Sequence, residues 1–155
     1  MVLESSTFRA GEFLFREGSE AKSLFLVKVG RISIRKSIDA GYVEIAQVGP
    51  NQILGEIGFF DHRPRSADVV AVTYCEVVEI PYEALAPMFE PAPDYIKKIM
   101  AGLAARLRDA DEVIRELKER LGESEVSLRE GKDLEEKIED PTESETARIL
   151  RQTEE

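Results

Sequence analysis

The chain has 155 residues, of which 43% are apolar, and a formal net charge of −10. This length and composition suffice for one hydrophobic core with an additional helical segment. No run approaches the ~20 apolar residues of a membrane span, and the N-terminus lacks the basic-then-apolar pattern of a secretory signal. We therefore expect a cytoplasmic protein that does not bind a membrane.

Single copies of cysteine and histidine restrict the chemistry of the chain. Cys75 is the lone cysteine and His62 the lone histidine, which excludes an internal disulfide framework and a His/Cys metal cluster. The apolar run around Cys75 predicts a buried strand thiol. We expect no metal and, without a serine-histidine-aspartate set or paired carboxylates on a rigid framework, no enzymatic activity.

Acidic side chains are concentrated at the C-terminal end. Residues 122–155 contain 12 acidic and 5 basic side chains and carry −7 of the net charge. A duplex-binding surface needs basic side chains to neutralise phosphates. We therefore expect a solvated acidic tail and no direct nucleic-acid partner.

The first ninety residues consist of short apolar runs separated by glycines. These runs are rich in Val, Ile and Phe, and several alternate apolar and polar residues, as half-buried strands do. The predicted strands are residues 12–15, 23–29, 31–36, 42–48, 67–72 and 75–80. Six or more short strands predict a mainly β fold, either a sandwich or a rolled barrel of the jelly-roll kind.

The pattern changes to helical at Pro81. The segment "PYEALAPMF" predicts a short helix, and residues 94–121 predict one long helix. Pro93 lies at the first turn of the long helix and Gly122 just after its end, in the positions that these residues favour. At 1.5 Å per residue, the helix is roughly 42 Å long. We expect it to project, because a compact domain of this size does not need such a length for its own packing.

Apolar residues recur along the long helix at alternating steps of four and three. They are Ile96, Met100, Leu103, Leu107, Ala110, Ile114, Leu117 and Leu121. A heptad seam of this length favours a parallel homodimeric coiled coil. The alternative is a helix that lies on its own β-core, which we consider for the part before Leu107. Beyond Ile114 we expect the strands to be too far away.

Residues 54–71, "LGEIGFFDHRPRSADVVA", carry the chemistry, and we call this segment the cassette. A helical turn starting near Gly55 would direct the free amides of Ile57 and Gly58 at an anion. Arg65 can hold two phosphate oxygens with its planar fork, and Ser66 can add a hydroxyl donor. The pattern indicates a phosphate site.

Glu56 indicates that the ligand carries a hydrogen-bond donor as well as a phosphate. A carboxylate beside an anion site repels the ligand unless the ligand also offers a donor, and a ribose hydroxyl is such a donor. A phosphate and a sugar hydroxyl within one short cassette describe a nucleotide whose phosphate and ribose lie close together. A cyclic nucleotide has this geometry.

The chain resembles the cyclic nucleotide-binding domain over roughly residues 8–121. This β-roll regulatory module occurs in catabolite activator proteins, in regulatory subunits of cAMP-dependent protein kinase and in nucleotide-gated channels. The specific part is "GEIGFF" followed by "RSA"; the spaced glycines of "RAGEFLFREGSEAKSLFLVKVGRISI" support it. The resemblance implies a β-roll with the cassette and a short helix in residues 1–93, a lid and dimerisation helix in 94–121, and a tail or linker in 122–155.

The resemblance also implies roles for individual residues. Glu56 matches the acid that accepts the ribose hydroxyl, and Arg65 matches the arginine that pairs with the cyclic phosphate. The residues expected to surround the phosphate are Gly55, Ile57, Gly58, Ser66 and Ala67. The alternative is a degenerate pocket in which Glu56 and Arg65 form a structural ion pair, so that the chain is only an interaction or dimerisation module.

The base site matches the family less well. Ala110 and Asp111 occupy the positions at which the family's long helix supplies polar residues. Arg106 matches an arginine near the ribose, and the alternative is that it is a surface charge. Asp111 can accept a proton from the adenine amine or from guanine N1 and N2. We expect Ile34 and Ile45 to wall the sugar and base. The sequence "RSA" favours cAMP as the ligand, with cGMP as the alternative.

The chain departs from the family pattern at one turn, and its sequence does not show which output it controls. Asn51 stands where the family has a glycine, which a left-handed Asn can replace. Nucleotide binding is expected to draw both the short helix after Pro81 and the long lid helix toward the cassette. The tail is too acidic and too short for a DNA-reading domain, so either an output domain belongs to a longer protein or the helix and tail regulate another chain.

Overall fold

The computed structural model describes residues 4–122 of the chain, so the acidic tail that we predict lies outside the described residues apart from Gly122. The strands are β1 (Glu4–Phe8), β2 (Phe13–Phe15), β3 (Ser23–Val29), β4 (Ile32–Ile38), β5 (Gly41–Val48), β6 (Ile53–Leu54), β7 (Asp68–Ala71) and β8 (Cys75–Pro81), and the helices are α1 (Glu56–Asp61), α2 (Tyr82–Phe89) and α3 (Asp94–Arg120). Among these helices, none combines the length and apolarity needed to cross a membrane.

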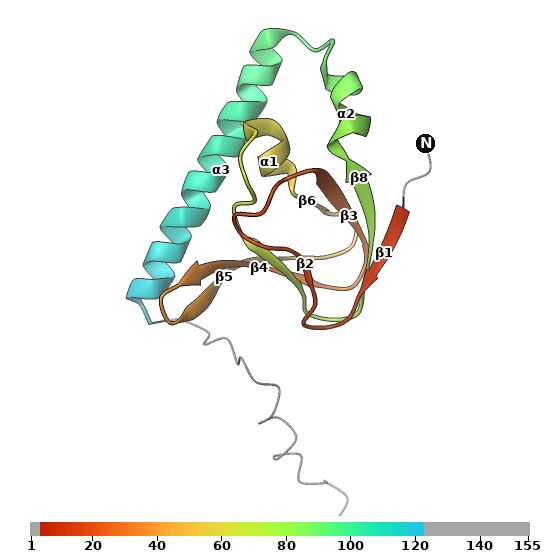
Figure 1. Cartoon of the computed structure of the whole chain (residues 1–155). Coiled ribbons are helices and arrows are strands. Elements are labelled where there is room, and N and C mark those ends of the chain that lie inside the picture. Colours follow the sequence, from red (N-terminus) through yellow and green to blue (C-terminus); the bar gives the residue numbers. More distant parts are fainter. Residues whose placement is uncertain (1–3, 123–155) are drawn as a thin grey trace, which may run out of the picture.

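The strands form two antiparallel four-stranded sheets. One has the order β1-β8-β3-β6 and the other the order β2-β7-β4-β5. Figure 1 shows the strands as one body, with α1 at its upper side and α2 and α3 rising from it to meet at a loop. The mainly β roll with flanking helices and a long C-terminal helix, predicted from the sequence, is confirmed.

The core lies between the two sheets and consists of side chains from both. Its buried members are Phe25, Val27, Ile32, Leu54, Val69, Ala71, Cys75 and Val77. Cys75 is free and fully buried, as predicted. Burial of these apolar side chains stabilises the packing of the two sheets.

The sequence-based prediction misses two strands, β1 and β6. β1 has the polar sequence ESSTF and lacks an apolar run, but it pairs along β8 from Glu4 opposite Glu79 to Phe8 opposite Cys75. β6 has only two residues, which pair with Leu26 and Phe25 of β3. In both cases the neighbouring strand, and not local propensity, decides the structure.

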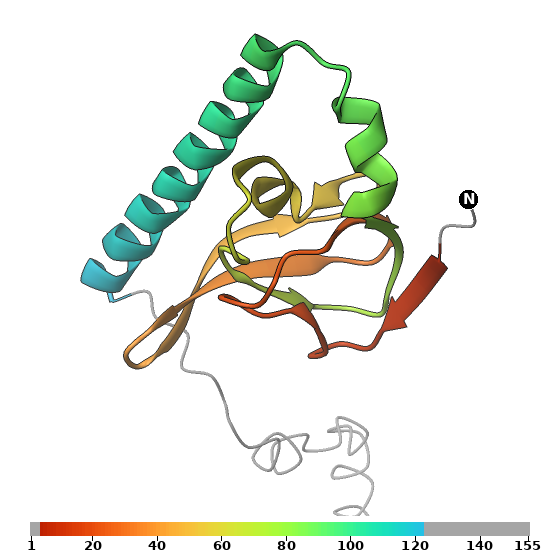
Figure 2. The same cartoon turned by 45° about the horizontal axis from the view of Figure 1, so that its top comes forward.

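Helix α3 lies against the body of the protein, so the expectation that it projects is wrong. It contacts α1, β5 and β4, and Glu112 forms an ion pair with Lys36 of β4 at 3.1 Å. Figure 1 and Figure 2 show its C-terminal end beside the β4–β5 hairpin. The physical reason is that hairpin, whose strands have seven and eight residues and provide a surface that the helix contacts.

Gly30 closes the β3–β4 turn in a conformation that other residues rarely adopt. Its φ is +94°, and a Cβ at this position would overlap the Tyr74 carbonyl oxygen and lie 2.6 Å from Cys75 Sγ. Gly11 has a similar φ of +87°, but a Cβ there would meet no atom within 4 Å. The two glycines therefore share the backbone constraint and differ in the space around them.

We predict that Gly30→Ala destabilises the protein much more than Gly11→Ala. The left-handed backbone costs an alanine about 1–2 kcal/mol at either position, and overpacking against the β7–β8 turn adds about 1–3 kcal/mol at Gly30 alone. Chemical denaturation of both variants measures the difference. Equal losses of unfolding free energy would show that the close approach around Gly30 is unimportant.

Candidate functional site

The cassette turns sharply at Gly55, where β6 ends and α1 begins. Gly55 has a φ of +88°, and a Cβ there would overlap the Arg65 guanidinium and lie 3.0 Å from the Ser23 carbonyl oxygen. Only glycine fits this position. No side chain caps α1, and Ile57 and Gly58 in its first turn are buried. The turn thus brings the start of α1 next to Arg65, ten residues further along the chain.

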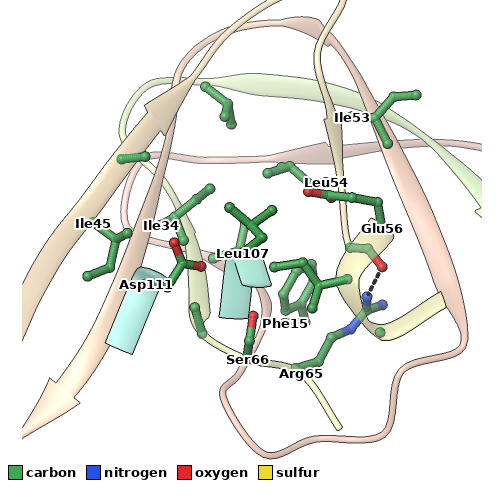
Figure 3. Close-up of a pocket in the computed structure, with 17 residues that line it drawn as sticks. Phe15, Ile34, Ile45, Ile53, Leu54, Glu56, Arg65, Ser66, Leu107 and Asp111 are labelled. Atoms are coloured by element: carbon green, nitrogen blue, oxygen red, sulfur yellow. Dashed lines mark hydrogen bonds between the residues drawn. The ribbon is translucent and has the colours of Figure 1, made fainter. Parts of the chain in front are cut away.

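A cavity of about 160 Å³ opens between the cassette, the sheet that contains β4 and β5, and α3. Its lining residues are Phe15, Ile34, Ile45, Ala46, Val48, Ile53, Leu54, Gly55, Glu56, Ile57, Gly58, Arg65, Ser66, Ala67, Val69, Leu107 and Asp111. Figure 3 shows Arg65 and Ser66 at one side, Ile34 and Ile45 at the other, and Leu107 and Asp111 reaching in from α3. Apolar walls with a few convergent polar groups are typical of a small-molecule site.

Arg65 is the most constrained polar side chain of this pocket, with only 5% of its surface exposed. Nη2 donates to the Ser23 carbonyl at 2.8 Å, and Nη1 donates to the Tyr82 hydroxyl at 3.3 Å and to the Gly55 carbonyl at 3.4 Å. Its guanidinium carbon lies 4.0 Å from the centre of the Phe15 ring. Burial lowers the pKa of Arg65, but arginine remains protonated in proteins. The pocket therefore holds a desolvated positive charge.

One donor of Arg65 has no partner among the described residues. Its Nε is buried and makes no hydrogen bond. An unpaired buried donor costs about 1–3 kcal/mol, which a ligand can recover by supplying an acceptor. An anionic oxygen is the acceptor best matched to a guanidinium.

Glu56 and Asp111 are two carboxylates that face the same pocket. Burial is the main cause that raises the pKa of each, and the charge of Asp111 raises the pKa of Glu56 further. The structure has no ion pair between Glu56 and Arg65, the interaction expected of a structural pair. Nη1 and Nη2 of Arg65 instead donate to Ser23, Gly55 and Tyr82. Desolvated carboxylates with raised pKa values are typical of functional sites.

Of the three residues that the sequence predicts α3 to place in the pocket, only Asp111 lines it. Asp111 lines the pocket and is 9% exposed. Arg106 and Ala110 are exposed on α3 and do not line the pocket. One turn of helix separates Leu107 from Asp111, so they share a face, whereas Arg106 and Ala110 are each rotated by about 100° away from it. Leu107 lines the pocket instead, a residue that we assigned to the heptad seam.

Two ion pairs that sequence reasoning misses hold α3 in this position. Arg108 Nε lies 2.6 Å from Asp61 Oδ2 at the end of α1, and Arg108 Nη2 donates to the Pro64 carbonyl at 3.1 Å. Lys36 is buried and pairs with Glu112. Local sequence carries no signal for either pair, because each joins residues more than forty positions apart.

The structure therefore brings together ten of the twelve predicted site residues. They are Ile34, Ile45, Gly55, Glu56, Ile57, Gly58, Arg65, Ser66, Ala67 and Asp111. Asn51, where the family has a glycine, adopts the left-handed conformation that we expected, with a φ of 66°. Within residues 4–122, no three His, Cys, Asp or Glu side chains are placed to hold a metal ion.

Comparison with known proteins identifies the family of the chain. The family model described as cyclic nucleotide-binding domain matches residues 5–91. The chain is 30% identical over 98 residues to the type II regulatory subunit of cAMP-dependent protein kinase from Drosophila melanogaster, covering 63% of this chain and 26% of that protein. It is 27% identical over 107 residues to a CRP-like cAMP-activated global transcriptional regulator from Mycobacterium tuberculosis, covering 68% and 48%. The chain spans about half or less of the length of these relatives.

A solved structure supports the fold. The EAL enzyme Bd1971 in its cAMP-bound form aligns with a TM-score of 0.64 at 21% identity, over 77% of this chain and 30% of that one. The matched family model includes β1 to α2 and the whole cassette, which is more than half of the chain. The chain belongs to the cyclic nucleotide-binding domain family.

Proposed function

We propose that this chain is a cAMP sensor in which the buried Arg65 recognises the cyclic phosphate and Glu56 recognises the ribose. The observation that carries the proposal is the pairing of a buried guanidinium that has an unpartnered Nε with a desolvated carboxylate in one pocket. A ligand that offers both an anion and a hydroxyl donor satisfies both groups. The relatives named for cAMP support this ligand class.

The two ends of the ligand would meet different parts of the pocket. The phosphate would lie at Arg65 and Ser66, beside the start of α1, because the absence of a side chain at Gly55 lets the Arg65 guanidinium lie next to the backbone there. The ribose hydroxyl would donate to Glu56. This division separates the negative end of the ligand from the Glu56 carboxylate, so that the pocket favours a ligand with both features over inorganic phosphate.

The base would lie between the β4–β5 sheet and α3. Ile34 and Ile45 offer apolar walls, and Leu107 and Asp111 reach the same cavity from the helix. Asp111 would accept a proton from the adenine amine. We propose cAMP as the preferred ligand and cGMP as a weaker one, and calorimetry with both nucleotides distinguishes them.

The signal would leave through α3. This helix touches the ligand cavity through Leu107 and Asp111 and contacts α1 of the cassette, so ligand binding can favour one position of the helix over another. For such coupling the ligand must stabilise one arrangement, typically by about 1–3 kcal/mol. We propose a regulatory and non-catalytic role in the cytoplasm, with no direct contact to nucleic acid or membrane. The output is a partner protein or a domain linked through residues 122–155.

We further propose that α3 pairs with α3 of a second copy. Most of the heptad positions remain exposed within one chain, with Leu103 at 54%, Leu117 at 50% and Leu121 at 73% exposure. An apolar stripe on a solvent-facing helix is stabilised when a partner helix covers it. The body-facing stripe of α3, which includes Ala104 and Asp111, lies about 80–100° away from this seam, so both contacts are compatible.

We predict that Arg65→Ala weakens cAMP binding by at least about 30-fold, because a phosphate left without its charged partner loses roughly 2–5 kcal/mol. Arg65→Lys, which keeps the charge but not the fork, should retain part of the affinity. The exposed neighbour Arg63 provides the control, and Arg63→Ala should bind as the wild type does. Calorimetry measures affinity, and melting temperatures exclude damage to the fold. Wild-type protein, purified free of nucleotide, that binds neither cAMP nor cGMP at millimolar concentration would refute the proposed function.

Glu56→Gln tests the ribose contact by two independent measurements. We predict about tenfold weaker cAMP binding and little further loss for 2′-deoxy-cAMP, since the acid accepts from the 2′-hydroxyl. Without ligand, the variant should be more stable than the wild type. Folding raises the pKa of the Glu56 carboxyl above its ordinary value of 4.5. The protonated carboxyl therefore contributes stability that is fully present below pH 4.5 and is lost as the pH rises through the folded-state pKa.

The stability gained by Glu56→Gln should therefore be largest near neutral pH and disappear toward acidic pH. Thermal unfolding as a function of pH measures it, with Glu83→Gln on the exposed side of α2 as the control for the same charge change. A gain that is independent of pH, or undiminished discrimination against the 2′-deoxy analogue, would contradict the role of Glu56.

The dimer proposal predicts that Leu103→Glu combined with Leu117→Glu yields monomers, because the seam would then contain four like charges. Both side chains are exposed in one chain, so the fold should persist. Gly102→Glu combined with Ala105→Glu adds the same charges at exposed positions outside the seam and should leave the dimer intact. Sedimentation equilibrium measures the mass. A double variant at the seam that still sediments as the wild type does would exclude pairing through α3.

A further inference from the structure

Tyr82 connects the cassette with the start of α2. It is the first residue of α2 and follows β8 directly. Its ring packs edge-on against Phe59 of α1, with centroids 4.9 Å apart. Its hydroxyl donates to the Gly55 carbonyl at 2.7 Å and accepts from Arg65 Nη1 at 3.3 Å. One hydroxyl thus contacts both ends of the cassette from an element outside it.

These contacts determine which edge of the Arg65 guanidinium is occupied. Nη2 is held by the Ser23 carbonyl, and Nη1 is shared between Tyr82 and Gly55, while Nε has no partner. Two independent anchors, one from β3 and one from α2, hold a planar group in one orientation. The donor that remains is the one that an anion in the pocket would use.

The phenol hydroxyl of Tyr82 is suited to this task. It both donates and accepts, so it satisfies the Gly55 carbonyl and the Arg65 donor at once. Burial raises the pKa of Tyr82, which keeps the hydroxyl proton that the bond to Gly55 requires. The position of the hydroxyl also depends on Gly58, because a Cβ there would lie 3.2 Å from it.

We propose that Tyr82 is a positioning residue for phosphate recognition: its hydroxyl fixes the Arg65 guanidinium so that Nε remains available to the ligand phosphate. The inference rests on the proposed function of the pocket and assigns it a residue outside the cassette. It also links α2 to the phosphate site, because the first residue of α2 hydrogen-bonds the arginine that would bind the phosphate.

The test is a double-mutant cycle with Tyr82→Phe and Arg65→Lys. Phenylalanine keeps the ring packing and removes only the hydroxyl. We expect Tyr82→Phe to weaken cAMP binding by about five- to tenfold in the wild-type background and by less than about twofold in the Arg65→Lys background, since the fork is no longer there to be positioned. Tyr74→Phe, at an exposed tyrosine, should change neither. Equal losses in both backgrounds, or no loss in either, would overturn the inference while leaving the proposed function intact.

A measurement without nucleotide separates this inference from the proposed function. If the wild-type protein binds no cyclic nucleotide, the proposed function fails, and the unliganded protein still decides whether Tyr82 orients Arg65. We expect the Arg65 Nε–H resonance in an NMR spectrum to shift in Tyr82→Phe and to be unchanged in Tyr74→Phe. We also expect Tyr82→Phe to lower the melting temperature more in the wild-type than in the Arg65→Lys background. An unchanged resonance with equal losses of melting temperature would refute the positioning role.

Discussion

A single buried guanidinium organises the functional end of this protein. A full positive charge removed from water needs compensating partners, because its desolvation costs several kcal/mol. Arg65 finds them in the carbonyls of Ser23 and Gly55, the Tyr82 hydroxyl and the Phe15 ring. These partners come from both sheets, the cassette and α2, so the orientation of one side chain depends on the assembly of the whole roll.

The pocket retains features that oppose stability. Glu56 and Asp111 are desolvated carboxylates with raised pKa values, and Arg65 keeps an unpartnered Nε. Each disfavours the ligand-free protein at neutral pH, and a ligand that supplies an acceptor and a donor can reverse these costs. In the proposed function, affinity for such a ligand would therefore arise partly from groups that the fold leaves unsatisfied.

Helix α3 is held over this pocket by charge pairs that lie outside it. Arg108 joins the helix to Asp61 and Pro64 of the cassette, and Lys36 joins it to the β-roll through Glu112. These contacts place Asp111 inside the cavity and leave most of the apolar heptad positions exposed. The same helix thus lines the pocket with some residues and exposes apolar residues on a neighbouring face, which is the geometry that the proposed coupling requires.

Local sequence determined the elements that carry a strong periodic or stereochemical signal: the six apolar strands, both predicted helices, the left-handed Asn51 and the cassette residues from Gly55 to Ala67. It did not reveal β1 and β6, whose structure depends on pairing with β8 and β3. Only the tertiary structure decided that α3 lies on the roll and that Leu107, rather than Arg106 or Ala110, lines the pocket. It also decided that Tyr82 contacts Arg65. The physical reason is that these contacts join residues far apart in the chain, and the rotation of a helix about its axis is set by the surface it packs against.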